Sequence, residues 1–463
     1  MLQIRRDPDY LDDPEVDDWL NGFGQRLVQA VPGGVGDMSF EFFALRDRSL
    51  NAFALPGGFI GVHSGLLLAA ANESEIASVL GHEIGHVTQR HIARSIAQQS
   101  QAMPLMMASM LLAVLAARAS PNAAMGLGTL GQTMAISKML AFSRDAEREA
   151  DRVGFETLRE AGFDAAGSVS FFSRLQQASR AYDNPAAPAY LRSHPVTSER
   201  IADMQARTLG LVPRAVVDSP DFFMMRARLK VLENARSQQN PNKDGLRDAA
   251  AFFQQALAEH SMPQAAAYYG LALVEGLKRD QRGAGAFNLA LGRAQQALPG
   301  GHPWLDRLAI DFRRESGDAG QSGDSVGAAD PDSAVSLASA SRARFPDSRA
   351  IAHAEARALL AANTPALAVE RIGLATARWS NDARLWDQLA LAYGAQGKRA
   401  LAHHAAGEAA ARRRNWQVAY EQMRFAQRAG DTDFISASMI DARLRVVQGE
   451  ALREREELGG NVR

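Results

Sequence analysis

The amino-acid sequence predicts two domains of different class. Residues 1–212 are expected to form an α+β domain of helices with a small sheet, and residues 213–463 an all-α solenoid of tetratricopeptide (TPR)-like repeats. Three observations support this division. Short apolar runs broken by turn residues occur near the N-terminus, helical periodicity begins at Asn72, and a pattern repeats at a 34-residue offset in the C-terminal half. A chain of 463 residues is also too long for one compact core.

The first elements expected along the chain are strands and a long helix. Residues 38–45 (MSFEFFAL) and 49–67 (SLNAFALPGGFIGVHSGLL) are interpreted as two or three strands, with a Pro-Gly-Gly turn between two of them. A helix is expected after Asn72, which can cap its first turn, and Glu75 three residues later completes a capping box. The apolar periodicity predicts that this helix runs to about Gln98.

Residues 102–117 (AMPLMMASMLLAVLAA) are the most apolar segment of the chain. A bilayer span needs roughly 17–25 apolar residues. This run is shorter and contains Pro104, so we do not expect it to cross a membrane. It is either a buried helix or hairpin packed on the domain, or an apolar flap that makes peripheral contact with a membrane or an unfolded client protein.

The C-terminal half is predicted to consist of repeated helical hairpins. A 34-residue displacement places Phe253 over Phe287, and the spacing W-x2-L-A-x2-Y that starts at Trp386 resembles the TPR repeat. A single hairpin cannot bury its apolar face alone, so successive hairpins are expected to stack into a solenoid with a concave, protein-binding surface. A generic helical bundle is the alternative. Residues 316–333 interrupt the series and are predicted to be a flexible insertion.

Composition excludes several classes of function. The formal net charge is −1, so no global field favours nucleic acid, and no nucleic-acid partner is expected. There is no cysteine, which excludes disulfides, thiolate nucleophiles and cysteine-ligated zinc, and leaves histidines and carboxylates as metal ligands. The N-terminus lacks the pattern of a signal peptide, so the protein is either cytoplasmic or has lost a leader.

The stretch VLGHEIGHVTQRH, residues 79–91, predicts a catalytic zinc site. His82 and His86 are four residues apart, so they lie on one face of a helix, offset by about 40°, and can share one zinc ion per chain. Glu83 is not placed as a ligand, but its carboxylate can take a proton from a water that attacks a peptide carbonyl. His91 would lie on the opposite face of the same helix, where a structural role is expected.

A third zinc ligand is expected in residues 143–151 (SRDAEREAD). Glu147 and Asp151 are again four residues apart on a predicted helix. One of them can bind the metal while the other accepts a hydrogen bond from a ligating imidazole. The residues alone do not exclude Glu149 or Glu156 as the ligand.

The motifs NAFALPGG, HEIGH and S-R-x-x-E-x-x-A-D, in this order, resemble the HtpX and CAAX-prenyl-protease family of zinc metallopeptidases, over roughly residues 15–205. The resemblance implies a zinc endopeptidase of the gluzincin type, with Glu147 as the third zinc ligand and Asp151 supporting a ligating histidine. A C-terminal TPR array is typical of a soluble, periplasmic branch. The expected location is therefore the periplasm of a Gram-negative bacterium, with the leader removed, and the cytoplasm is the alternative.

The same family has a later His-Pro pair followed by an arginine, which correspond to His194, Pro195 and Arg200. The resemblance implies that His194 reaches the active site, so we count His194 and Arg200 with Glu83 as candidate catalytic residues. His194 would either stabilise the oxyanion or occupy the open zinc position and silence the enzyme. Residues 51–55 (NAFAL) are either an edge to which an extended substrate adds or an ordinary core strand.

These features predict an endopeptidase of the cell envelope that degrades misfolded or stalled proteins, with outer-membrane β-barrel proteins as the leading class by resemblance. The TPR-like domain would recruit unfolded or misassembled substrates, or the outer-membrane assembly machinery. The alternative function is a chaperone or assembly scaffold with a latent, self-restrained peptidase. A third is a cytoplasmic quality-control peptidase.

Overall fold

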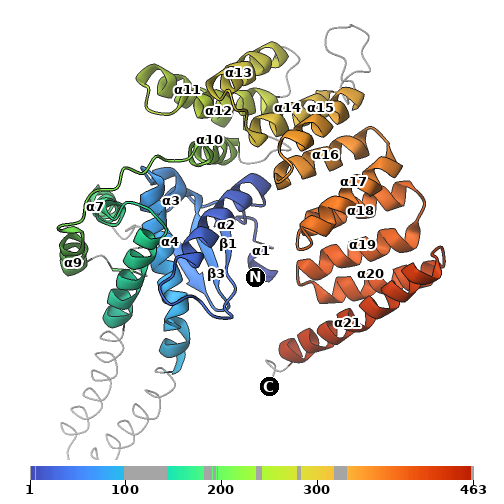
Figure 1. Cartoon of the computed structure of the whole chain (residues 1–463), viewed down its shortest axis with the longest axis horizontal. Coiled ribbons are helices and arrows are strands. Elements are labelled where there is room, and N and C mark those ends of the chain that lie inside the picture. Colours follow the sequence, from blue (N-terminus) through green and yellow to red (C-terminus); the bar gives the residue numbers. More distant parts are fainter. Residues whose placement is uncertain are drawn as a thin grey trace, which may run out of the picture. The chain divides into compact units, whose positions relative to one another are not determined.

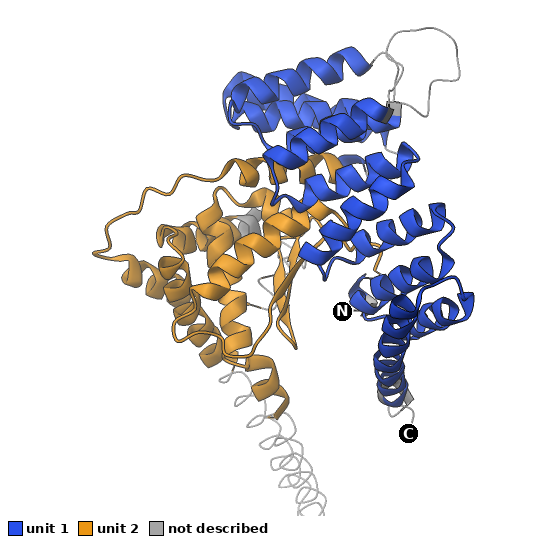
Figure 2. Ribbon diagram, turned by 45° about the vertical axis from the view of Figure 1, so that its right-hand side comes forward, with its two compact units in different colours: residues 1–6, 234–463 blue, residues 7–233 orange. Residues whose placement is uncertain are grey.

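The computed structural model describes residues 2–5, 7–97, 143–181, 190, 194–195, 197–235, 242–278, 283–316 and 331–459. The chain forms two compact units, one of residues 7–233 and one of residues 234–463 with residues 1–6 (Figure 2). The first unit contains a three-stranded sheet among helices, and the described part of the second is helical. The predicted order, an α+β domain followed by helices, is confirmed.

The sheet of the first unit has three strands, in the stretches where strands were predicted. They are β1 (Glu41–Leu45), β2 (Ala52–Leu55) and β3 (Phe59–His63). Strand β3 is central, parallel to β1 and antiparallel to β2, so β2 lies at an edge of this sheet. Gly57 and Gly58 adopt φ values of 91° and 80° in the turn between β2 and β3, which is why this turn requires glycine.

The other described elements of the first unit are helices, some of which lie next to the sheet (Figure 1). They are α2 (Pro14–Gln29), α3 (Ser64–Ala69), α4 (Glu73–Thr88), α7 (Ala166–Ala181), α9 (Ser198–Thr208) and α10 (Pro220–Ala235), together with helical residues 91–97 and 143–160. Helix α2 packs on β1, and α4 packs on β2 and β3. The helix that carries His82, Glu83 and His86 therefore lies against β2, an edge strand of this sheet.

Helix α4 begins where the sequence predicts but ends earlier. The Asn72 side chain accepts a hydrogen bond from the Glu75 N–H at 2.9 Å, while the Glu75 carboxylate accepts from Ala71 N instead of closing the expected box on Asn72. The prediction that this helix continues to about residue 98 is wrong, because α4 ends at Thr88. Arg90 adopts a left-handed φ of 54°, which breaks the helical hydrogen-bond series and starts a separate helix at residue 91.

The two units divide at Glu233, whereas the sequence suggested a boundary after residue 212, before α10. Arg228 of α10 donates from Nε and Nη2 to the two carboxylate oxygens of Asp13, each at 2.7 Å, and both side chains are buried. Asp13 also caps α2 by accepting from Val16 N. This buried ion pair ties most of α10 to the first unit.

The second unit is a succession of helices, each packed on its neighbour in the sequence (Figure 1). They are α11 (Lys243–Glu259), α12 (Gln264–Lys278), α13 (Gly283–Ala297), α14 (Pro303–Ser316), α15 (Pro331–Arg344), α16 (Arg349–Ala361), α17 (Pro365–Arg378), α18 (Ala383–Ala395), α19 (Arg399–Arg412), α20 (Trp416–Ala429) and α21 (Phe434–Gly459), and the short α1 (Leu2–Arg5) is grouped with them. Both ends of the predicted insertion 316–333 are helical, since Ser316 ends α14 and Pro331 begins α15. Residues 317–330, and the apolar segment 102–117, lie outside the described residues.

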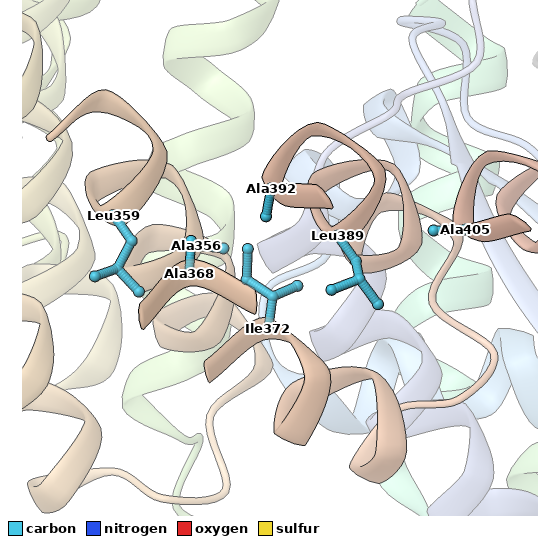
Figure 3. Close-up of a cluster of buried hydrophobic side chains, with 7 residues drawn as sticks. All are labelled: Ala356, Leu359, Ala368, Ile372, Leu389, Ala392 and Ala405. Atoms are coloured by element: carbon cyan, nitrogen blue, oxygen red, sulfur yellow. The ribbon is translucent and has the colours of Figure 1, made fainter. Parts of the chain in front are cut away.

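Alanine dominates the core of the second unit. One buried cluster joins α16 to α19 and consists of Ala356, Leu359, Ala368, Ile372, Leu389, Ala392 and Ala405 (Figure 3). Trp386 and Tyr393, the aromatic positions of the predicted repeat signature, pack against this cluster. Small side chains at helix contacts let neighbouring helices approach closely. Among the ranges given above, no helix is both long and apolar enough to span a membrane.

Candidate metal centre

Glycines bring α4 and the helix of residues 143–160 into backbone contact. A Cβ atom at Gly154 would lie 2.7 Å from His82 N, and one at Gly85 would lie 3.0 Å from Ala150 O. Gly81 faces Gly154 at a similarly short distance. Because no side chain separates the two helices here, the imidazoles of α4 meet the carboxylates of the second helix directly.

Four buried side chains converge where these helices cross. His82, His86, Glu147 and His194 each direct one potential ligand atom into a cluster whose atoms all lie within 4.8 Å of one another. The Nε2 atoms of His82 and His86 are 2.9 Å apart, and Glu147 lies 3.4 Å from each of them, with Oε2 facing His82 and Oε1 facing His86. The structure thus brings together the two histidines and the glutamate that the sequence proposed as metal ligands.

A carboxylate and a guanidinium stand behind His82. Its Nδ1 lies 2.9 Å from Asp151 Oδ1. Arg200 donates from Nε and Nη2 to Asp151, both at 2.7 Å, and its Nη1 lies 2.9 Å from Glu147 Oε2. Asp151 therefore holds the His82 ring so that Nε2 points into the cluster, and Arg200 holds both carboxylates.

These contacts set the charge of the centre. Burial lowers the pKa of His82, but hydrogen bonds to Asp151 and Glu147 outweigh it and raise that pKa to about 10. Burial raises the pKa of Glu147, yet hydrogen bonds from His194, His82 and His86 hold it far below its ordinary value. The pKa of Asp151 is lowered in the same way by His82 and Arg200. Both carboxylates are consequently ionised, which is the form that binds a cation.

Glu83 is buried beside the cluster without a hydrogen bond. Neither of its carboxylate oxygens has a hydrogen-bond partner among the described residues, and its side chain is 1% exposed. The His194 Nε2 atom lies 3.6 Å from Glu83 Oε1. A buried carboxylate without a hydrogen bond is rare, and it marks a position suited to accept a proton from a bound water.

His194 reaches the cluster on a separate segment of chain. Its Nδ1 lies 3.0 Å from Glu147 Oε1 and 3.4 Å from His82 Nε2. Tyr190 N donates to Leu50 O at 3.2 Å, just before β2, and His194 N donates to Tyr190 O. Arg200 Nη1 also donates to Pro195 O, at 2.8 Å. The His-Pro pair and its following arginine are therefore both at the centre.

His91 contacts the centre in a way that the sequence did not predict. It was expected on the far face of a continuous helix, but because α4 ends at Thr88 the chain turns back, and His91 Nδ1 lies 3.0 Å from His86 Nδ1. The other ring nitrogen, Nε2, lies 3.0 Å from Glu149 Oε2. Glu149 is thus placed behind His91 instead of in the cluster, and Glu156 pairs with Arg152. The sequence hinted at the contact between His91 and His86 only by placing a third histidine in residues 79–91.

Comparison with known proteins gives a consistent assignment. The model of the family described as Peptidase family M48 matches residues 14–208, which include every side chain of the cluster. A β-barrel assembly-enhancing protease of Yersinia pestis is 31% identical over 402 residues, covering 86% of this chain and 76% of that protein.

Other relatives align over a shorter region. A β-barrel assembly-enhancing protease (BepA) of Escherichia coli K12 is 36% identical over 239 residues, 51% of this chain and 48% of that protein. A mitochondrial metalloendopeptidase of Arabidopsis thaliana is 32% identical over 187 residues, 40% of this chain and 35% of that protein. The chain therefore spans about half the length of the Escherichia coli relative and about a third of the length of the Arabidopsis thaliana relative. Since the family model covers the whole centre and the Yersinia pestis relative is matched over most of its length, the chain belongs to peptidase family M48.

Proposed function

We propose that this chain is a zinc-dependent endopeptidase, in which His82, His86 and Glu147 hold one Zn²⁺ ion. The observation that carries this proposal is the buried cluster at the crossing of α4 and the helix of residues 143–160. Two imidazoles and one carboxylate are a common ligand set of catalytic zinc sites. The Glu83 carboxylate beside them, which accepts no hydrogen bond from any described residue, supports a catalytic rather than a purely structural site.

The residues around the metal have separable roles in peptide hydrolysis. Zn²⁺ would polarise the scissile carbonyl and lower the pKa of the attacking water. Glu83 accepts the proton of that water and can deliver it to the leaving amine. Asp151 and Arg200 orient His82 and Glu147. Strand β2 lies at an edge of the described sheet and next to α4, so its backbone groups on the side away from β3 could pair with an extended substrate.

We infer that His194 restrains this site. Its Nδ1 atom lies among the ligand atoms, in position to fill a fourth coordination position that hydrolysis must leave open. The hydrogen bond from Tyr190 N to Leu50 O also places the segment that leads to His194 beside the residues that precede β2. This arrangement favours restraint over an oxyanion-stabilising role, and it supports the second candidate function, a chaperone or scaffold with a latent peptidase.

The substrates and partners that we propose follow from the names of the relatives. β-Barrel assembly-enhancing proteases of Escherichia coli and Yersinia pestis suggest misfolded or stalled outer-membrane β-barrel proteins as substrates, in the periplasm of a Gram-negative bacterium. The helices of residues 242–459 would act as a TPR-like solenoid that recruits these proteins or the outer-membrane assembly machinery. The packing of Trp386 and Tyr393 in the core of that unit supports a TPR-like repeat. Peripheral membrane contact through residues 102–117 is part of this proposal.

Zinc content and degradation of an unfolded protein, measured on the same samples, test the proposal. Wild type should hold one zinc per chain, and His86→Ala should lose it. Glu83→Gln should keep zinc and lose about 10²–10⁴-fold in turnover, the contribution of a general base. Glu156→Gln, a change at the exposed Arg152 pair, is the control and should match wild type. A wild-type chain without zinc would contradict the proposal.

His194→Ala decides between restraint and catalysis in the same assay. Restraint predicts that turnover rises while zinc content stays at one per chain. A fall in turnover with zinc retained would assign His194 to oxyanion stabilisation instead. Wild type and His194→Ala that both hold zinc and cut nothing would favour the scaffold function.

A further inference from the structure

We propose that His91 is a positioning residue for the metal ligand His86, and that Glu149 and Arg94 complete a relay behind it. This inference rests on the metal site proposed above. It assigns a function to the third histidine of the stretch 79–91, which stands outside the group of four ligand atoms.

The relay is a continuous series of short polar contacts. His91 Nδ1 lies 3.0 Å from His86 Nδ1, and His91 Nε2 lies 3.0 Å from Glu149 Oε2. Arg94 Nη1 donates to the same Glu149 oxygen at 2.8 Å. The His91 side chain is 4% exposed, while Glu149 and Arg94 are 32% and 48% exposed, so the series runs from the buried ligand to the surface.

The chemistry of the three partners gives the relay one direction. An ionised carboxylate can only accept hydrogen bonds, so His91 Nε2 must be the donor to Glu149. In a neutral ring the remaining nitrogen is then an acceptor, and His91 Nδ1 accepts from the Nδ1–H of His86. His86 is thereby held in the tautomer whose Nε2 lone pair points into the cluster, which is the form that binds a metal.

His82 is also supported by a carboxylate and an arginine, but the carboxylate contacts its ring directly. There, Asp151 contacts Nδ1 directly and Arg200 binds Asp151. Behind His86, His91 contacts the Nδ1 atom with one ring nitrogen and Glu149 with the other. Each ligand histidine is therefore supported by a carboxylate and an arginine, and only the His86 support needs an intermediate imidazole.

The left-handed turn at Arg90 makes this contact possible. Helix α4 ends at Thr88, Arg90 takes a φ of 54°, and His91 begins the next helix. On a continuous helix the side chain five positions after His86 would point about 140° away from it. The turn redirects His91 onto the ring that it supports.

Zn²⁺ affinity of the full-length chain, measured by competition with a chromophoric chelator, tests the relay. His91→Phe keeps a ring of similar size but removes the acceptor, and should weaken Zn²⁺ binding about 10–100-fold. His91→Gln supplies an amide oxygen for His86 and an N–H for Glu149, and should restore most of the affinity. The absorption spectrum of bound Co²⁺ should shift in His91→Phe and return toward wild type in His91→Gln, because it reports the ligand geometry.

Two glutamates on the same helix provide a matched comparison. Glu149→Gln should weaken Zn²⁺ binding, whereas Glu156→Gln, outside the relay, should not. Urea unfolding of the metal-free variants measures packing separately. His91→Phe and Glu149→Gln that both bind Zn²⁺ as tightly as wild type would overturn the inference, and so would a loss in His91→Phe that His91→Gln does not restore. If His91→Phe does not fold, Glu149→Gln against Glu156→Gln decides. A wild-type chain that binds no Zn²⁺ would instead overturn the proposed function.

Discussion

At the scale of single residues, the centre depends on a buried ion pair behind one of its histidines. Asp151 receives two hydrogen bonds from Arg200 and faces His82 Nδ1, and all three side chains are buried. Buried charges are costly unless they are paired. The pair therefore stabilises the fold and orients a ligand at the same time, so its loss should affect both properties.

Asp151→Asn should weaken Zn²⁺ binding about 10–100-fold, because the amide is a poorer acceptor for His82. It should also lower the free energy of unfolding by about 3 kcal/mol, the lower end of the cost of breaking a buried ion pair, since Arg200 still contacts Glu147. Chelator competition and urea unfolding measure the two effects.

An exposed ion pair on the same helix as Arg200 is the control. Asp203 accepts from Arg207 at 2.8 Å, and the two side chains are 45% and 30% exposed. Asp203→Asn should cost less than about 1 kcal/mol and leave Zn²⁺ affinity unchanged, because water screens the pair. Equal losses in both variants would show that Asp151 does not act through burial.

Local spacing explains which residues of the centre were predictable. His82, Glu83 and His86 were identifiable because a four-residue interval places two side chains on one helix face. Glu147 and Asp151 followed the same spacing, although spacing alone did not separate Glu147 from Glu149. The contact of His91 with His86 was not predictable, because it depends on a left-handed arginine that neither glycine nor proline marks.

At the scale of elements, the distance between two helices determines the geometry of the centre. A Cβ atom at Gly154 would lie 2.7 Å from His82 N and 2.9 Å from Gly81 C, so backbone atoms of α4 would have to move. Gly154→Ala should therefore push the helices apart, displace His82 from Glu147 and weaken Zn²⁺ binding by at least tenfold, despite the higher helix propensity of alanine. Chelator competition and the Co²⁺ spectrum would detect the displacement.

A glycine in open space separates this steric effect from helix propensity. Gly22 lies in α2, and a Cβ atom there would have no neighbour within 4 Å. Gly22→Ala should raise the free energy of unfolding by about 1 kcal/mol and leave Zn²⁺ affinity unchanged. If Gly154→Ala behaves in the same way, close approach of the helices is not required for the centre.

The elements themselves were more predictable than their pairing. Turn residues and apolar runs indicated two or three strands in the stretches that hold β1, β2 and β3, and Asn72 marked the start of α4. The order β1-β3-β2, with a parallel pair between β1 and β3, depends on long-range contacts that local patterns do not encode. The end of α4 was missed for a similar reason, because the apolar periodicity continues past Thr88 while the backbone turns.

At the scale of the whole molecule, the side chains of the candidate metal centre all belong to one of the two compact units. His82, His86, Glu147 and His194 lie within residues 7–233. The sequence suggested a boundary at residue 212 because the helical, repetitive pattern begins soon after it, whereas the buried pair of Arg228 and Asp13 is a long-range contact. A ligand that binds only the native form stabilises the unit that it binds.

Removal of the metal should therefore destabilise residues 7–233 and leave the second unit unaffected. At a free Zn²⁺ concentration a thousandfold above Kd, binding contributes about 4 kcal/mol, and a chelator removes that contribution. Hydrogen exchange with and without chelator should show lost protection in α4 and in residues 143–160, with no change in α16 to α19. Equal loss in both units would indicate that they unfold as one.

Glu408→Gln tests the converse case, in which the second unit is destabilised and the metal centre is left intact. Burial raises the pKa of Glu408, but hydrogen bonds from Arg443 and Arg412 outweigh it and hold that pKa below its ordinary value. A lowered folded-state pKa means that the ionised pair stabilises the fold above the ordinary carboxyl pKa of 4.5, and that this stability is lost as the pH falls through the folded value.

Glu408→Gln should reproduce that loss at neutral pH, because it removes the charge at all pH values. Protection should fall in α19 and α21, which carry Glu408 and Arg443, while Zn²⁺ affinity stays at the wild-type value. A change in Zn²⁺ affinity would instead mean that the two units are energetically coupled.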